Sequence, residues 1–292
     1  MRQRIVIILL GMFLCAPPAA ALTVTTWNFE WLSTEQSLKI KPSLRSEQDY
    51  KTLSGYFNQI DPDVLAFQEI NDRHALHKVL DKNRYQIIFS QRTKQAQRQF
   101  DDINQYTGFA IKRDFTVVNM PDLDLHPLQT NKLRFASYVV LERPQTKKLH
   151  LLSVHLKAGC SGAKRNNYAC RQLVEQSEVL NRWINERAAN NESFIIAGDF
   201  NHNLAYPNDW LWQLLTNNSE QSVALITKAT PADCLVRSKR KPTKTHQFRQ
   251  LIDHIVVSKD LFATPGKQTV FNKQDVLTRQ LSDHCPISTT IH

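Results

Sequence analysis

Short apolar runs rich in β-branched residues recur along the chain, and each has about the length of one β-strand. Such residues favour strands because their branched side chains pack well on a pleated surface. A chain with this pattern is expected to fold around β-sheets. The predicted strands span residues 22–27, 64–67, 86–89, 109–111, 137–141, 149–154, 194–197, 252–257 and 286–291.

Helical patterns lie between some of these strands. Leu53, Phe57 and Ile60 are spaced as on one face of a helix, and Pro62 ends that pattern. Apolar residues also line one face of a longer segment, at positions 173, 180, 184 and 188. The fold class is therefore mixed α/β. Several strands within 109–154 follow one another without a helix, so mixed or largely antiparallel sheets are expected rather than a Rossmann fold.

The first residues are typical of a secretory signal. Arg2 and Arg4 precede an apolar stretch, and small residues follow at 19–21. A membrane anchor is the alternative, but the apolar stretch is too short to cross a hydrocarbon core of about 30 Å. We therefore expect a signal peptide at 1–21, one domain at 22–292, and a secreted or periplasmic monomer with no stable membrane anchor.

One of the five cysteines, Cys15, lies in the predicted signal. An even number then remains for an oxidising compartment, which favours two disulfides with three pairings open. Cys160 and Cys170 are near neighbours around a polar loop, so we prefer that pair, which leaves Cys234 with Cys285. A zinc site is the weaker interpretation because no C-x-x-C spacing occurs.

The formal net charge of +10 at pH 7 favours a polyanionic partner. Charge alone leaves nucleic acid and an anionic membrane equally open. Basic residues are concentrated in two stretches, 157–171 and 237–244, which either contact phosphates or are ordinary solvated loops. No G-x-G-x-x-G or Walker A motif is present, so a nucleotide cofactor is not indicated.

Acidic and amide side chains follow two of the predicted strands. Glu69 ends the strand that begins near Val64, and Asp199 and Asn201 follow the strand 194–197. Carboxylates at strand ends suit a hard cation such as Mg²⁺. If the chain stays extended, Asp199 and Asn201 leave the same face. The plainer alternatives are an ordinary strand-end carboxylate and a Gly-Asp-Asn turn.

Two histidines and another aspartate occupy similar positions. His155 follows the strand 149–154, and His284 directly follows Asp283. Imidazoles titrate near neutrality, so such a pair could exchange protons with water and a leaving alkoxide. Asp253 could hold His284 in one tautomer. Each of these residues could instead be a structural hydrogen-bonding group.

Together these motifs resemble the endonuclease/exonuclease/phosphatase superfamily over nearly the whole chain after the signal. The matching segments are, in family order, 26–28, 62–69, 153–156, 198–201 and 282–284. The resemblance implies a four-layered αββα sandwich with two packed mixed sheets, and a site where a divalent cation and two histidines assist the attack of water on a phosphate ester.

The resemblance also implies a role for each matched residue. Asn28, Glu69 and Asp283 would support the metal, which we expect to be Mg²⁺, with Mn²⁺ or Ca²⁺ as alternatives. The implied catalytic residues are His155, Asp199, Asn201, Asp253 and His284. Arg134 and Tyr206 would bind the substrate.

These features favour a metal-dependent endonuclease that hydrolyses DNA, and RNA as a second nucleic-acid substrate, with little sequence preference. One alternative is a sphingomyelinase-like phospholipid phosphodiesterase. Such enzymes carry an exposed aromatic hairpin, for which the segment 210–212 is the nearest candidate, although its helical spacing favours core packing. The other alternative is a nucleic-acid-binding or toxin subunit on the same fold.

Overall fold

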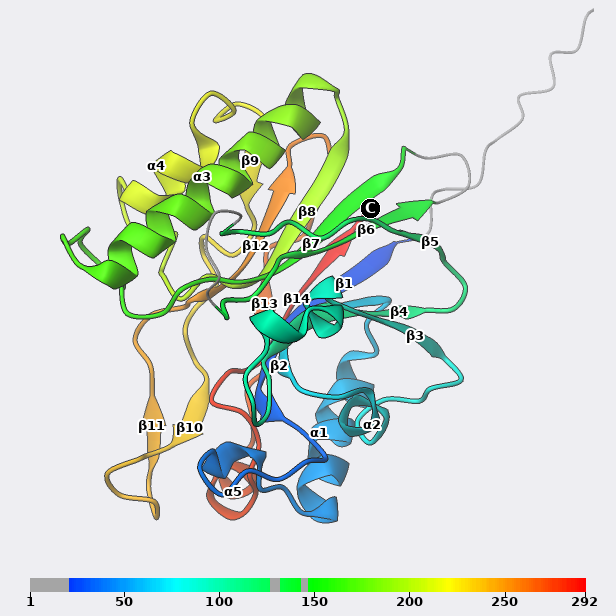
Figure 1. The fold of residues 1–292 in the computed structure, drawn as a ribbon, viewed down its shortest axis with the longest axis vertical. Coiled ribbons are helices and arrows are strands. Elements are labelled where there is room, and N and C mark those ends of the chain that lie inside the picture. Colours follow the sequence, from blue (N-terminus) through cyan, green and yellow to red (C-terminus); the bar gives the residue numbers. More distant parts are fainter. Residues whose placement is uncertain (1–20, 127–131, 143–146) are drawn as a thin grey trace, which may run out of the picture.

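Two six-stranded β-sheets lie face to face at the centre of the protein, with helices on both outer sides (Figure 1). The computed structural model describes residues 21–126, 132–142 and 147–292. The predicted signal peptide lies outside the described residues except for Ala21. Among the described residues, no helix combines the length and the apolar character needed to cross a bilayer.

The first sheet is built around β1, the long strand that begins the described domain. β1 pairs in parallel with β2 and antiparallel with β14, and the remaining pairs are antiparallel. In spatial order the strands are β13 (Lys267–Gln268), β14 (Ile287–Ile291), β1 (Leu22–Leu32), β2 (Val64–Ile70), β4 (Tyr106–Lys112) and β3 (Tyr85–Phe89).

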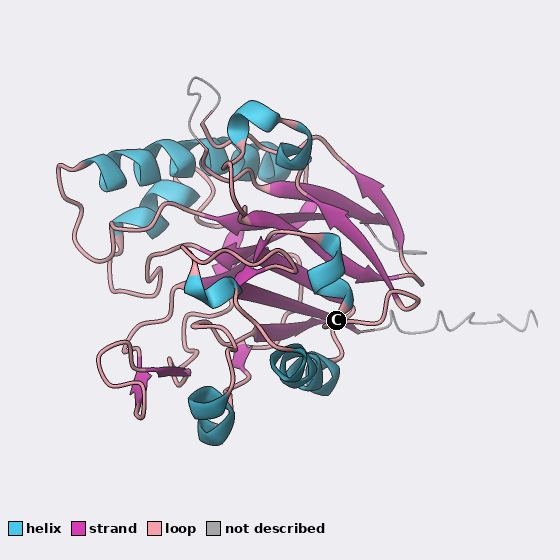
Figure 2. Cartoon of the chain, turned by 60° about the horizontal axis from the view of Figure 1, so that its bottom comes forward, coloured by secondary structure: helices cyan, strands magenta, loops and turns pink. Residues whose placement is uncertain are grey.

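The second sheet is also mixed, because β7 and β8 are parallel and its other pairs are antiparallel. Its order is β5 (Thr116–Asn119), β6 (Ser137–Glu142), β7 (Leu149–His155), β8 (Ser193–Asp199), β12 (Asp253–Ser258) and β9 (Val223–Leu225). A separate two-stranded hairpin, β10 (Leu235–Arg237) and β11 (Thr245–Gln247), stands apart from both sheets (Figures 1 and 2).

Helices complete the outer layers (Figure 2). Those on the first sheet are α1 (Glu47–Ile60), α2 (Arg73–His77) and α5 (Lys273–Thr278), and those on the second sheet are α3 (Tyr168–Ala189) and α4 (Trp210–Thr216). Short 3₁₀ turns occur at η1 (Lys41–Ser43), η2 (Gln91–Lys94) and η3 (Ala96–Arg98). The four-layered sandwich of two mixed sheets is therefore confirmed.

Side chains alternate in direction along each strand, so each sheet contributes to a core on both of its faces. In β1, Val24 faces the core between the sheets, whereas Trp27 belongs to the outer core that also contains Phe57 of α1. Ile195 of β8 joins Val24 in the inner core, and Phe194 packs outward beneath α3. Successive strand residues point to opposite faces, so each central strand can bury both of its sides.

Both preferred disulfides are present. Cys160–Cys170 links the loop after β7 to the first turn of α3, and Cys234–Cys285 links the start of the hairpin to the segment before β14. Cys285 directly follows His284, so the second disulfide joins the hairpin to the neighbourhood of a candidate catalytic residue.

The structure extends most of the predicted strands and adds others. β1 continues five residues past its predicted end, to Leu32. The sequences of β10, β11 and β13 contain no apolar run from which a strand could be predicted. The segment 210–212 begins α4, where Leu211 is buried and its two tryptophans pack against the core of the second sheet. It does not form an exposed aromatic hairpin.

Gly198 allows the closest approach between the two parallel strands of the second sheet. It pairs with Val154, and a Cβ added at Gly198 would lie 2.0 Å from the Val154 carbonyl oxygen. We expect Gly198→Ala to lower the free energy of unfolding by about 1–3 kcal/mol, because β7 and β8 must separate. Urea unfolding measures this change.

Gly55→Ala is the matched control for the added methyl group. Gly55 lies inside α1, where a Cβ would meet nothing within 4 Å. Alanine there should stabilise the protein by about 0.5–1 kcal/mol because glycine disfavours helix interiors. A Gly198→Ala protein as stable as wild type would contradict the proposed close contact.

Candidate active site

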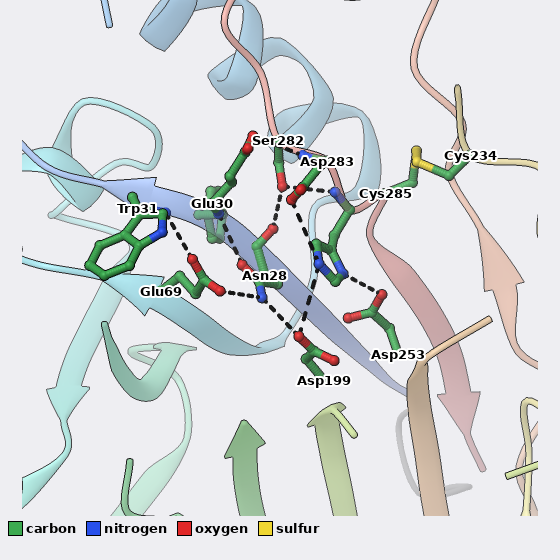
Figure 3. Close-up of polar contacts among 12 residues, drawn as sticks. Asn28, Glu30, Trp31, Glu69, Asp199, Cys234, Asp253, Ser282, Asp283 and Cys285 are labelled. Atoms are coloured by element: carbon green, nitrogen blue, oxygen red, sulfur yellow. Dashed lines mark hydrogen bonds and ion pairs between the residues drawn. A yellow bond between two sulfur atoms is a disulfide. The ribbon is translucent and has the colours of Figure 1, made fainter. Parts of the chain in front are cut away.

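The ends of six central segments meet at one edge of the sandwich. Parallel pairing brings the last residues of β1 and β2 together, and likewise those of β7 and β8. β12 is antiparallel to β8, so its first residue lies opposite the last residue of β8. The side chains that meet there are Asn28, Glu69, His155, Asp199, Asp253 and His284. Figure 3 shows four of them, Asn28, Glu69, Asp199 and Asp253.

Irregular backbone turns Glu69 toward this edge. In a regular strand Glu69 would share the outward direction of Phe67, but the β2 register shifts between Phe67 and Ile70, and Glu69 has a φ of 58°. β1 has a matching irregularity after Asn28, where Glu30 has a φ of 47°. Bulges of this kind re-aim side chains, and non-glycine residues with positive φ cluster at functional sites.

Asn28 joins the two central carboxylates. Its Nδ2 donates to Glu69 Oε1 and to Asp199 Oδ2, both at 3.1 Å, and the backbone N–H of Trp31 donates to Glu69 Oε2 at 3.2 Å. Burial raises the pKa of Glu69, and burial also raises the pKa of Asp199, to about 7. The fold therefore concentrates negative charge where water cannot compensate for it fully.

Glu30 is a further member of the site that the sequence analysis missed. Its Oε2 accepts from the backbone N–H of Asp283 at 3.1 Å, and its own N–H donates to Asn28 Oδ1 at 2.9 Å. Burial, together with the charge of Asp283, raises the pKa of Glu30 to about 8. Residue spacing gave no signal for Glu30, because β1 is irregular after Asn28 and Glu30 has a positive φ.

His284 brings positive charge to the carboxylates. Its Nδ1 lies 2.7 Å from Asp253 Oδ2, whereas its Nε2 lies 3.9 Å from Asp199 Oδ2 and faces the site. Burial opposes the charged imidazole, but the combined charges of Asp253 and Asp199 outweigh it and raise the pKa of His284 well above its usual value. The ring is held protonated, with Nε2 available to a ligand.

Two connections fix the position of His284 along the chain. Ser282 Oγ donates to the carbonyl of Asn28 at 2.6 Å and accepts from the His284 N–H at 3.0 Å. The indole N–H of Trp27 donates to the His284 carbonyl at 3.1 Å. These bonds attach the segment before β14 to the end of β1, so both motifs keep one relative position.

His155 is neutral, whereas His284 is protonated. It is 3% exposed, and its Nε2 lies 3.5 Å from both Glu69 Oε1 and Asp199 Oδ2. Burial, reinforced by the nearby Arg134, keeps the pKa of His155 well below its usual range. A neutral imidazole suits a hydrogen-bonding role between the carboxylates better than that of a proton donor.

A turn after β8, rather than continued strand, brings Asn201 to the site. β8 ends at Asp199, and Asn201 has a φ of 52°, so the assumption of a continuous extended chain was wrong. The turn folds Asn201 back, and its N–H donates to Asp199 Oδ1 at 2.7 Å. Its Nδ2 donates to Asp199 Oδ2 and to the Leu156 carbonyl, both at 3.1 Å.

Arg134 contacts the same carbonyl as Asn201. Its Nη2 donates to the Leu156 carbonyl at 3.2 Å, and burial lowers its pKa while the charges of Glu69 and Asp199 oppose that effect. Arg134 thus brings a second cationic group close to the carboxylates. A planar guanidinium of this kind is well suited to binding phosphate.

The remaining predicted residues lie at the periphery. Asp283 has its Oδ1 3.7 Å from His284 Nε2 and its Oδ2 3.9 Å from Lys239 Nζ, at the side of the site facing the hairpin. Tyr206 lies half-buried in the loop between β8 and α4. Within the described residues its side chain has no hydrogen bond to the other members of the site.

The oxygen-rich side of the site fits a divalent cation. Ligand atoms of Glu69, His155 and Asp199 all lie within 4.8 Å of one another. Carboxylates whose pKa values are raised by burial would be stabilised in their charged form by a cation. Glu69 and Asp199 offer the oxygen ligands that Mg²⁺ prefers, and Asn28 orients both carboxylates by donating to each.

The pair of Asp253 and His284 leads to a pH-dependent prediction. A raised folded-state pKa adds stability that is fully present below the unfolded value of 6.5 and is lost as pH rises through the folded-state pKa. In metal-free buffer, Asp253→Asn should therefore cost about 1–3 kcal/mol at about pH 6 and less at about pH 10. Urea unfolding at both pH values measures the difference.

Asp114→Asn is the control, because Asp114 is exposed. This variant should change stability little at either pH. An equal loss of stability for Asp253→Asn at both pH values would show that His284 does not carry the pH dependence.

The fold resembles several solved structures of low sequence identity. TDP2 from C. elegans shares 16% identity with a TM-score of 0.62, and the match covers 93% of this chain and 75% of that chain. A mannosyl-6-phosphatase from Bacteroides thetaiotaomicron also shares 16% identity, with a TM-score of 0.62. The match covers 93% of this chain and 99% of that chain. The human Nocturnin catalytic domain with bound sulfate shares 19% identity, with a TM-score of 0.61. The match covers 93% of this chain and 94% of that chain.

A search of curated protein sequences found no match. The model of the endonuclease/exonuclease/phosphatase family, in contrast, matches residues 25–284, a span that contains every residue of the site described above. The family comprises hydrolases of phosphoester bonds. This chain belongs to the endonuclease/exonuclease/phosphatase family.

Proposed function

We propose that this protein is a divalent-cation-dependent phosphodiesterase that hydrolyses DNA, with RNA as a second substrate and little sequence preference. The observation that carries the proposal is that a positively charged side chain faces negatively charged side chains within one site. A protonated His284, held by Asp253, faces the carboxylates of Glu69 and Asp199. Phosphate-ester hydrolysis needs groups of both signs, because water must be deprotonated while negative charge grows on the phosphate.

Asp199 is assigned as the group that accepts a proton from the attacking water. A pKa of about 7 places it where a general base works best near neutrality. Asn201 and Asn28 each donate to its carboxylate, which holds the oxygens in a defined direction. As the water oxygen bonds to phosphorus, its proton moves to Asp199 and the bond from phosphorus to the leaving oxygen breaks.

His284 is assigned as the cationic partner of the phosphate and of the leaving alkoxide. Nδ1 is engaged by Asp253, so only Nε2 can donate its proton. Arg134 provides a second positive charge beside the same carboxylates. A divalent cation held at Glu69 would supply further stabilisation of the phosphate charge.

Both disulfides and the predicted signal peptide support a secreted or periplasmic location, where the two cystine bonds persist. The net charge of +10 supports a polyanionic substrate. Burial of the segment 210–212 against the core removes the aromatic membrane-docking element expected of a sphingomyelinase-like enzyme. We further propose that the protein acts as a monomer.

Incubation of the purified, oxidised protein with plasmid DNA and Mg²⁺ tests the proposal. We expect degradation that EDTA abolishes, and a fall in kcat of about 10²–10⁴-fold for His284→Ala, because the positioned proton donor is lost. His74→Ala, which removes an exposed histidine of α2, is the control and should cleave as wild type does.

Other outcomes would identify the alternatives. Hydrolysis of sphingomyelin with DNA left intact would favour the phospholipid phosphodiesterase. Release of inorganic phosphate from sugar monoesters, again with intact DNA, would favour a phosphatase. DNA that is bound but not cleaved by wild-type protein would favour the binding subunit and would overturn the assignment as a nuclease.

A further inference from the structure

A large groove adjoins the active site on the side of the β10–β11 hairpin. It has a volume of about 1090 Å³ and lies between the hairpin, the segment 39–42 and the end of α5. Glu30 and Asp283, which belong to the active site, also line the groove. The groove therefore opens directly beside the reacting centre. Its volume reaches the upper limit of ordinary small-molecule pockets, about 300–1,000 Å³.

The walls of the groove are basic on both sides. Lys39 and Lys41 line it from the segment before α1, and Lys239 and Arg240 line it from the hairpin. The side chains of Lys39, Lys41 and Arg240 form no hydrogen bond or ion pair within the described residues, so their charges are directed to solvent. Facing basic walls provide the electrostatic channel that a phosphate backbone requires.

Aromatic rings line the same groove. Phe248 is 47% exposed although it is a large apolar residue, and its ring meets that of His246 edge-on with centroids 5.0 Å apart. Both residues line the groove from the end of the hairpin, and Trp31 lines it next to Glu30 (Figure 3). Exposed rings beside positive charge are the combination on which unpaired bases stack.

The hairpin is held firmly in position at its base. Arg237 donates from Nε to the Val276 carbonyl at 3.0 Å and from Nη2 to the Arg279 carbonyl at 2.7 Å. The Cys234–Cys285 disulfide attaches the start of β10 beside His284. Hence the groove keeps a fixed position relative to the active site, even though the hairpin stands apart from the sheets (Figure 2).

We propose that this groove binds a single-stranded stretch of nucleic acid on one side of the scissile phosphate, and that the enzyme therefore prefers single-stranded substrates. The proposal rests on the proposed function and adds a substrate class to it. Phosphates lie along Lys39, Lys41 and Arg240, and a base stacks on Phe248. In a duplex the bases are already stacked and paired, so the aromatic surface has no partner there.

A membrane is a poorer match for the same surface. The hairpin turn between β10 and β11 is Ser238-Lys239-Arg240-Lys241-Pro242-Thr243-Lys244, which has no apolar side chain to insert between lipids apart from its proline. Phe248 lies at the base of the hairpin and lines a concave surface. Membrane-docking elements instead expose their apolar residues at a protruding face.

Fluorescence anisotropy in EDTA tests the binding without dependence on turnover. The probes are a labelled single-stranded DNA oligonucleotide of about twenty nucleotides, its RNA equivalent and its DNA duplex. We expect wild-type protein to bind the single strands more tightly than the duplex. The triple variant Lys39→Gln, Lys41→Gln, Arg240→Gln should raise the Kd for single strands about tenfold and reduce the slope of log K against log salt by about 2.

The matched control removes the same charge elsewhere. Lys82, Lys148 and Lys259 adjoin the ends of β3, β7 and β12 that are farthest from the active site, and their triple substitution by glutamine should leave the single-strand Kd unchanged. Hydrolysis of bis-p-nitrophenyl phosphate, which is too small to occupy the groove, should be the same in both triple variants. An equal loss of binding in both would mean that net charge, rather than the groove, holds the strand.

Phe248 tests the stacking component separately. Phe248→Ala should raise the Kd for single strands about tenfold, because stacking on one ring is lost, and Phe248→Trp should restore binding. Phe262→Ala is the control, since Phe262 is also exposed and packs against a histidine, His292, beyond the far end of β12. An unchanged Kd for Phe248→Ala would exclude stacking in the groove.

The outcomes separate this proposal from the proposed function. Protein that binds single strands through the groove but cleaves no nucleic acid would overturn the proposed function alone. Cleavage with equal preference for duplex and single strand, unaffected by the groove variants, would overturn the groove proposal alone. Binding to phosphatidylglycerol vesicles through Lys41 and Arg240, with no binding of oligonucleotides, would assign the groove to lipid and also overturn it.

Discussion

The negative charge buried at the end of the sandwich determines much of the structure around it. Glu69 and Asp199 lie where the sheets exclude water, and burial raises the pKa values of both. Their charge is compensated by the amide of Asn28 and by the cations His284 and Arg134. Unpaired buried charge is unfavourable, so each compensating group must be held in place. Asp253 holds His284, and Ser282 holds the backbone of Asn28.

The topology supplies those positions from segments distant in sequence. Two parallel pairs, β1 with β2 and β7 with β8, deliver their last residues to one edge, and antiparallel β12 brings its first residue to the same place. Polar groups below the site connect the sheets, since Gln68 donates to Ser153 Oγ, which donates to the Phe67 carbonyl. These bonds keep the sheets in register, so the two halves of the site stay aligned.

The proposed chemistry and the proposed substrate recognition occupy different parts of this molecule. The reactive groups lie on the rigid strand ends of the sandwich, whereas the basic and aromatic groups of the groove lie on the hairpin and on the segment before α1. The Cys234–Cys285 disulfide connects the two parts next to His284. Loops placed on a rigid scaffold can change in composition without disturbing the core, which suits them to selecting among phosphate esters.

Local pattern in the sequence was enough for the mixed α/β class and for many of the candidate site residues, whereas the four-layered arrangement was implied by the family resemblance. Apolar runs gave the central strands, and the residues directly after them included Glu69, His155 and Asp199. The hairpin was not visible, because β10 and β11 are short, largely polar strands without an apolar run. Glu30 was missed and the direction of Asn201 was wrong, since both depend on positive backbone φ angles that residue spacing does not reveal.

The sequence by itself determined where the central strands lie along the chain, although not where they end, because a run of apolar, β-branched residues is a local property. Only the tertiary structure decided the charge states of the two histidines. His155 is neutral because it is buried beside Arg134, and His284 is protonated because Asp253 and Asp199 lie next to it. Those environments are assembled from strands far apart in the chain, and the energy of a buried charge depends on distances in space rather than in sequence.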